Sequence, residues 1–148
     1  MKWKLWTAIG VMAVLSGCAT GYHSASNPIL GYTGGYWDAK GPGRLIKVGF
    51  SGNGFIKEDV VEKYLLYRCA EVTRREGGTH FVLYSSLPNA IRDVRSAERE
   101  AQSLGGKPYT WAYIDVVPAG TADAHSAEDV FKRLGPVVNP TSKTGAKS

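Results

Sequence analysis

The sequence predicts a small α+β fold, in which helices pack on one face of a three-stranded mixed sheet. Short β-type runs alternate with helix-type apolar stripes, glycine pairs separate several of them, and the 148 residues suffice for one core. A hydrophobic fraction of 43%, with four Trp, eight Tyr and four Phe, excludes a wholly disordered chain. The expected order of elements is β-α-β-(α)-β-α.

The first two elements are predicted by their apolar periodicity. Residues 44–50 alternate so that Ile46, Val48 and Phe50 share one face, which is typical of a strand. Residues 57–76 carry an apolar stripe at spacings of four, four and three, which predicts a helix with acidic residues first and arginines last. The stripe consists of Val61, Leu65, Cys69 and Val72.

The second half of the predicted domain contains two more strands and two more helices. Residues 80–85 and 109–117 are rich in aromatic and β-branched side chains and predict strands. Residues 90–104 carry a narrow apolar stripe and predict a helix, although a charged loop would have a similar pattern. Ser126 is expected to cap a short last helix. We expect the first helix to cross over between parallel strands and the third strand to lie beside the second.

The amino terminus has the pattern of a secretory signal. Lys2 and Lys4 precede the uncharged apolar run 5–15, which is too short to stay in a bilayer as a permanent helix. Residues 15–18, Leu-Ser-Gly-Cys, resemble the lipobox of bacterial lipoproteins, in which the cysteine takes a lipid and the signal is cut before it. This resemblance implies that Cys18 is the lipidation site, although an ordinary secretory signal with an incidental cysteine would look alike.

The expected organisation follows from that cleavage. Residues 1–17 form the signal peptide, 18–43 a lipidated Gly/Tyr-rich tether, 44–134 the α+β domain and 135–148 a disordered tail. Two or three acyl chains on Cys18 would hold the protein stably on a membrane, whereas one holds it only marginally.

The residue after the lipidated cysteine indicates the membrane. Ala19 stands where lipoproteins retained in the inner membrane typically carry Asp. By resemblance, the mature protein is expected at the outer membrane, facing the periplasm, with the membrane as partner through Cys18 and an envelope protein or cell-wall component as a further partner.

The charge of the predicted domain argues against a nucleic-acid partner. The whole chain has 18 basic and 13 acidic side chains, but residues 44–134 contain 13 basic and 12 acidic ones. Nucleic-acid binding depends on clustered basic charge, which this balance does not supply.

Residues that could carry catalysis do not form a recognisable motif. Ser51 lies in Gly-Phe-Ser-Gly-Asn, which departs from the nucleophile elbow at its last position. The three histidines are far apart in the sequence, and no metal-ligand spacing is present. Cys69 is expected to be a buried free thiol, with a disulfide-linked dimer or a redox sensor as the alternative. We therefore expect no enzyme, no cofactor and no metal.

An aromatic and glycine-rich segment is the candidate binding site. Tyr32, Tyr36 and Trp37 lie in Tyr-Thr-Gly-Gly-Tyr-Trp, and aromatic rings on such a backbone suit recognition of a partner strand, a glycan or a membrane interface. The alternative is that Tyr36 and Trp37 pack over a sheet edge as a first strand.

Several short motifs together resemble a family of small proteobacterial lipoproteins of unknown function. The motifs are Gly31–Tyr36, Phe50–Gly54, the helical residues Tyr64, Leu66, Arg68, Ala70, Glu71 and Thr73, then Phe81 and residues 127–130. The resemblance covers roughly residues 15–134, with 87–108 outside the motifs, and implies a location but no catalytic activity.

These observations favour a non-catalytic, lipid-anchored binding or assembly accessory at the outer membrane. The alternative is a lipoprotein that senses envelope stress or signals, through the predicted helix at 90–104 or through Cys69.

Overall fold

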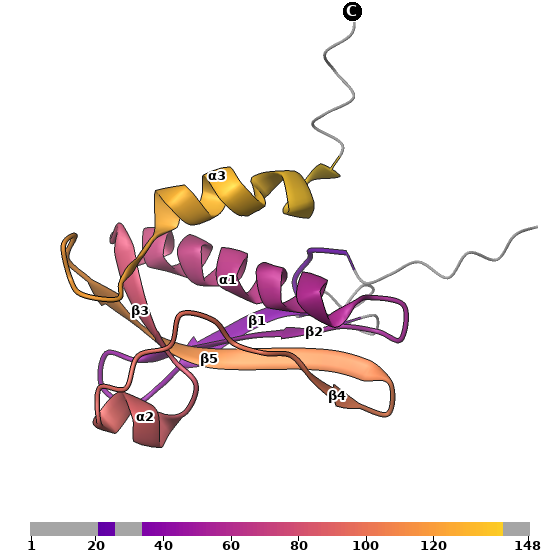
Figure 1. The fold of residues 1–148 in the computed structure, drawn as a ribbon, viewed down its shortest axis with the longest axis horizontal. Helices are drawn as coiled ribbons and strands as arrows, with labels where there is room; N and C mark the ends of the chain where they lie inside the picture. The colour runs from indigo at the N-terminus through magenta and orange to yellow at the C-terminus, as the bar shows by residue number, and fades with distance from the viewer. Residues whose placement is uncertain (1–20, 26–33, 141–148) are drawn as a thin grey trace, which may run out of the picture.

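The protein is described by a computed structural model, which covers residues 21–25 and 34–140. Within these residues, one six-stranded antiparallel sheet is flanked by helices (Figure 1). The strands are β1 Gly35–Lys40, β2 Ile46–Ser51, β3 His80–Tyr84, β4 Gln102–Leu104, β5 Lys107–Val117 and β6 His125–Ser126. The helices are α1 Glu58–Arg75, α2 Leu87–Ile91 and α3 Ala127–Val138.

The sheet corrects the predicted topology while the α+β class is confirmed. The strand order is β1-β2-β5-β3-β6, with β4 also paired to β5, so the expected three-stranded mixed sheet is wrong. Because β5 is antiparallel to both β2 and β3, these two strands run parallel to each other without being neighbours. The third predicted strand does lie beside the second, but it also separates the second from the first.

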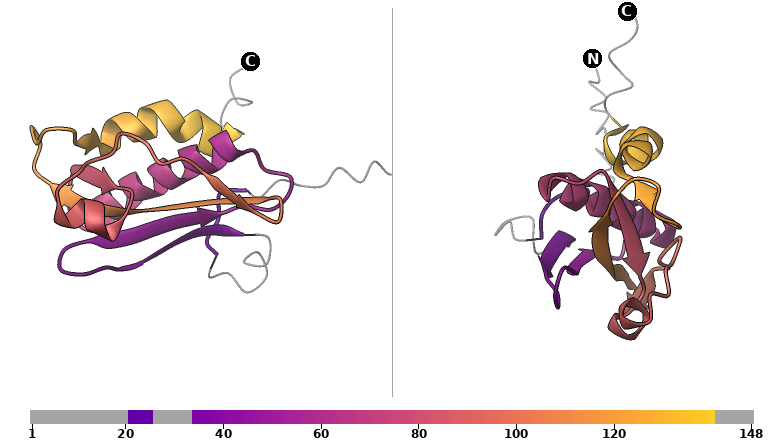
Figure 2. Two further views of the ribbon diagram at one scale, coloured as in Figure 1. Left: turned by 60° about the horizontal axis from the view of Figure 1, so that its bottom comes forward. Right: turned by 90° about the vertical axis from the view of Figure 1, so that its left-hand side faces the viewer.

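The two long helices lie on the same side of the sheet (Figures 1 and 2). Val48, Phe81 and Ile114 point from the strands toward α1 and are fully buried. The stripe predicted for α1 faces them, and all four of its members are buried. The acidic first turn and basic last turn of α1 are confirmed at Glu58, Asp59, Arg74 and Arg75. The core therefore lies between one face of the sheet and α1, with α3 packed on α1.

The helix expected at residues 90–104 does not form. The chain makes the short helix α2, turns through Asp93 with a φ of 54°, and then runs beside the sheet until it forms β4. The apolar stripe proposed there is not buried, since Ile91 is 78% exposed and Leu104 is 74% exposed. A stripe without a core to cover gives a helix little stabilisation, and Ser96 instead donates its backbone N–H to Leu83 at 2.7 Å.

Ordered structure extends beyond the residues assigned to the domain at both ends. β1 lies within the segment expected to be a tether, and residues 23–25 pair with Tyr36 through two backbone hydrogen bonds of 2.7 and 2.8 Å. Ser126 caps α3 as predicted, accepting a hydrogen bond from the Asp129 N–H. The helix continues to Val138, which is buried against the cluster around Phe50.

Candidate binding surface

The face of the sheet away from α1 and α3 carries aromatic side chains on β1 and β5, with Lys47 of β2 between them. Side chains alternate along a strand, so Trp37, Lys47 and Trp111 lie on the face opposite the buried core residues. Of the described helices, neither of the two long ones, α1 and α3, lies on this face (Figure 2). We refer to Trp37, Lys47, Trp111 and Tyr113 as the open-face cluster.

A glycine positions the first indole. Trp37 pairs with Gly49, which in turn pairs with Trp111. A Cβ atom at Gly49 would collide with the six-membered ring of Trp37, so the indole lies across the glycine backbone. Gly49 is fully covered by this ring, while Trp37 itself is half-buried. One face of the indole therefore rests on the strand.

Lys47 lies among three aromatic rings. Its Nζ atom is 4.4 Å from the ring centroid of Trp111 and 5.8 Å from those of Trp37 and Tyr113. Trp111 and Tyr113 meet edge to face at 5.8 Å. An ammonium near an aromatic ring is attracted by the ring quadrupole, which fixes the lysine without neutralising it.

A second cation approaches from the segment that precedes β4. The guanidinium carbon of Arg99 is 5.4 Å from the centroid of Trp111, and its Nε donates to the backbone oxygen of Trp111 at 2.9 Å. In the described part of the chain, neither Lys47 nor Arg99 forms an ion pair with a carboxylate. The carboxylate of Asp115 on this face is paired with Arg44 at 2.7 Å.

The open face ends at β3. Tyr84, on the same face, is only 6% exposed and donates to the Asp93 carboxylate at 2.6 Å. Burial is the main cause that raises the pKa of Tyr84. The end of the sheet next to α2 is therefore closed, and the accessible platform consists of β1, β2 and the first part of β5.

The predicted site residues Tyr36 and Trp37 point to opposite faces of the sheet, because they are adjacent in β1. Trp37 belongs to the open-face cluster, whereas Tyr36 points to the helix side, where its ring is 4.1 Å from the guanidinium of Arg68. Cys18 and Tyr32 lie outside the described residues. We did not predict Lys47 or Trp111 as site residues. The alternation along β5 does indicate that Trp111 and Tyr113 lie on the face opposite the buried residues.

On the helix side, charged groups join β1 to α1. Arg68 donates to Asp38 at 2.6 Å and to Glu71 at 3.0 Å, and Arg75 also pairs with Asp38 at 2.7 Å. Burial acts to raise the pKa of Asp38, but the hydrogen bonds from both arginines lower it overall. The side chains of Arg68 and Asp38 are only 17% and 15% exposed, so this network is structural.

The same network holds a residue of the expected tether. Tyr22 donates its hydroxyl proton to Glu71, and its ring packs among four other aromatic rings. Burial, and then the hydrogen bond to Glu71, raise the pKa of Tyr22. The four neighbouring rings are those of Tyr36, Phe50, Tyr64 and Tyr67. Tyr22 is thus fixed to the domain.

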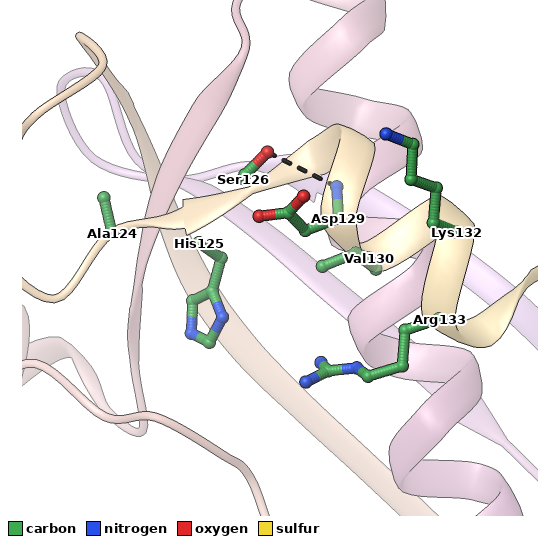
Figure 3. Close-up of a pocket in the computed structure, with 7 residues that line it drawn as sticks. All are labelled: Ala124, His125, Ser126, Asp129, Val130, Lys132 and Arg133. Atoms are coloured by element: carbon green, nitrogen blue, oxygen red, sulfur yellow. Dashed lines mark hydrogen bonds between the residues drawn. The ribbon is translucent and has the colours of Figure 1, made fainter.

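A shallow pocket lies beside the start of α3 (Figure 3). His125 stacks on Phe81 at 5.1 Å, and its buried Nε2 has no hydrogen-bond partner among the described residues. Burial, together with the nearby charge of Arg133, lowers the pKa of His125. In the described part of the chain, this buried Nε2 makes no hydrogen bond to the ionisable residues that line the pocket, Asp129, Lys132 and Arg133.

A groove between α1, α3 and the chain before β4 has an apolar floor that includes Leu65, Leu83 and Leu134. These leucines belong to the main core. Its rim is engaged within the protein, since Lys63 pairs with Asp59 at 3.1 Å and Glu62 accepts the Ala101 N–H at 2.8 Å. The charged residues Glu98, Arg99 and Arg133 also line this groove.

Cys69 and Ser51, the two nucleophiles considered in the sequence analysis, lie on different elements of the fold. Cys69 is fully buried on α1, and burial raises the pKa of its thiol, which disfavours the reactive thiolate. Ser51 ends β2, and the described residues contain no group of three or more metal-ligating side chains close enough to hold a metal ion.

The described helices include none with the length and apolar character needed to cross a membrane. Comparison with protein-family models, with curated proteins and with solved structures finds no match for this chain. The resemblance to small proteobacterial lipoproteins therefore stays a prediction from the sequence motifs.

Proposed function

We propose that this protein is a non-catalytic lipoprotein, anchored to the outer membrane through Cys18, which binds a glycan of the cell wall on its open sheet face. The observation that carries the proposal is the open-face cluster: two indoles and a phenol surround Lys47 on the face opposite α1 and α3. The lipid anchor comes from the sequence at residues 15–18.

The chemistry of the cluster suits a sugar chain. Sugar rings present an apolar C–H face, which packs on an indole, and hydroxyl or carboxylate oxygens at the rim, which accept hydrogen bonds from cations. Trp37 and Trp111 supply indoles on β1 and β5, the two strands that flank β2. Lys47 and Arg99 supply donors without a competing carboxylate in the described chain. A flat face also suits an extended polymer better than a small molecule, which requires a concave pocket.

Other partners fit this surface less well. Lysine is depleted from the cores of protein–protein interfaces, yet Lys47 lies at the centre of this cluster. Aromatic residues on a sheet can also stack nucleic-acid bases, but such proteins add a positively charged groove. The near balance of 13 basic and 12 acidic residues over positions 44–134 does not supply one.

Cosedimentation with purified cell-wall sacculi tests the proposal. We expect the wild-type protein to sediment with the sacculi and Trp37→Ala or Trp111→Ala to weaken binding about tenfold each, the effect of roughly 1.4 kcal/mol. Phe55→Ala is the matched control, because Phe55 is 66% exposed and lies outside the cluster. Absence of binding by the wild type, or equal binding by the Trp variants, would refute glycan recognition.

A further inference from the structure

Two exposed apolar side chains lie at one end of the molecule, outside the proposed glycan site. Phe55 is 66% exposed in the loop between β2 and α1, and Leu104 is 74% exposed beside the turn between β4 and β5. Both loops lie at the same end of the sheet (Figure 1). We call Phe55, Leu104 and the exposed Lys57 and Lys107 the apolar tip.

The two loops of the apolar tip are joined to each other. Gly52 donates its N–H to the backbone oxygen of Pro108 at 2.7 Å. A Cβ atom at Gly54 would lie 3.8 Å from the oxygen of Gly106, so the loops run side by side. Gly105 and Gly106 both have positive φ, which lets β4 turn tightly into β5 and places Leu104 at the very end of the hairpin.

The first described residues of the chain also pack near this end. Tyr22 packs in one cluster with Phe50 and with Ile56, the residue next to Phe55. Only three residue steps separate Gly21 from Cys18, and they span at most about 11 Å when fully extended. A lipid on Cys18 therefore keeps this end of the domain close to the membrane surface.

We propose that the apolar tip rests on the membrane, with Phe55 and Leu104 inserted at the lipid interface and Lys57 and Lys107 beside the lipid headgroups. The inference rests on the lipid anchor of the proposed function, but not on glycan binding. Aromatic and aliphatic side chains with flanking lysines are typical of interfacial contacts, since the long lysine stem lets the charge reach the headgroups. Glu58 and Asp59 begin α1 nearby, so apolar insertion and the anchor, rather than net charge, hold the tip in place.

This orientation has a consequence for the open face. β2 ends and β5 begins at the apolar tip, so the strands extend away from the membrane. The open-face cluster then stands to the side of the molecule, where the membrane does not cover it. A lipid surface is thus compatible with a glycan on the same molecule.

Depth-dependent quenching tests the orientation. The full chain is produced with a single labelling site, Phe55→Cys or Leu104→Cys, and reconstituted in phosphatidylethanolamine–phosphatidylglycerol vesicles that carry nitroxide lipids. Cys69 is fully buried and an acylated Cys18 cannot react, so only the new thiol takes the fluorophore. Ala119→Cys is the control, because it is exposed on the connection between β5 and β6 at the opposite end (Figure 1).

We expect nitroxide lipids to quench the label at 55 or 104 at least threefold more than the label at 119. Equal quenching at the three sites, in protein that floats with the vesicles, would overturn the orientation and leave the anchor intact. If the chain does not float, the anchor fails, and the orientation falls with it. Sacculus binding by the unlabelled protein reports separately on glycan recognition.

Discussion

The two faces of the sheet differ although they are built from the same strands. Toward the helices, Phe50, Val48 and Ile114 are fully buried, and charged groups occur there in a paired network with little exposure. On the other face, Lys47 and Arg99 remain half-buried among aromatic rings and pair with no carboxylate in the described chain. The first face supplies stability, whereas the second keeps the hydrogen-bonding capacity that the proposed glycan site requires.

Tyr36 and Trp37 show this difference within two adjacent residues. Tyr36 packs against Tyr22 and Arg68 under α1, and Trp37 lies across Gly49 on the open face. Because successive side chains of a strand point to opposite faces, neighbours in sequence take different roles. A double substitution at 36 and 37 would mix a structural effect with a binding effect, so the two must be tested apart.

The largest contrast is expected between Phe50→Ala and Trp111→Ala. Removing the fully buried Phe50 side chain should lower the free energy of unfolding by about 3 to 5 kcal/mol through lost burial and a cavity. Removing the half-buried Trp111 should cost about 1 kcal/mol. Urea unfolding of both variants measures the difference, and equal losses would mean that the open face also serves as core.

The paired charges on the helix side give the next contrast. Arg68→Met should lower the free energy of unfolding by about 3 kcal/mol. The carboxylates of Asp38 and Glu71 would stay partly buried while losing the arginine that pairs with both. Lys47→Met on the open face should leave stability nearly unchanged, because Lys47 pairs with no carboxylate in the described chain. Thermal melting of the two variants checks this, and a Lys47→Met loss as large as that of Arg68→Met would contradict the division of roles.

Acid unfolding adds a second measurement on Arg68. The folded pKa of Asp38 is lowered, so its stabilising contribution is complete above the ordinary aspartate pKa and is lost as the pH falls through the folded value. Arg68→Met should therefore move the acid-unfolding midpoint to higher pH, whereas Lys47→Met should not move it.

Local patterns predicted the main elements because the apolar residues in those segments are buried. Alternation in β2 and β5 and the stripe of α1 correspond to residues that now face one core. The stripe at residues 90–104 also has a helix-type spacing, but Ile91 and Leu104 face solvent and the chain in that range is not helical beyond Ile91, where α2 ends. Periodicity indicates which face could be buried, and only the tertiary fold provides something to bury it against.

The strand order and the candidate site were less accessible from sequence. β1 has glycine at its start and reads as a linker, and its pairing with β2 depends on contacts that local periodicity does not contain. Tyr22 lies 49 residues from Glu71, its hydrogen-bond partner. The open-face cluster combines Trp37, Lys47 and Trp111 from three strands, so it became visible only once their register was known.

A smaller structural change should damage the open face alone. Gly49→Ala places a methyl group where the Trp37 indole lies, and the half-buried indole can move toward solvent. We expect a stability loss of about 1 kcal/mol, together with sacculus binding as weak as that of Trp37→Ala. Gly54→Ala is the control, because its Cβ would make only an ordinary contact. Full sacculus binding by Gly49→Ala would show that the position of the indole is unimportant.

The smallest expected effect is a loss of stability in mild acid, caused by His125 on the edge strand β6. Burial lowers the pKa of His125, whose ring stacks on the buried Phe81. Between the lowered folded pKa and the ordinary value near 6.5, the unfolded chain binds the proton more readily, so stability falls as the pH drops below about 6.5. His125→Phe keeps an aromatic ring on Phe81 and removes a buried nitrogen without a partner in the described chain. We therefore expect the melting temperature of this variant to fall less than that of the wild type between about pH 7.5 and about pH 5.5, a range that includes the ordinary histidine pKa of about 6.5. An unchanged slope in His125→Phe would assign the acid sensitivity to another group.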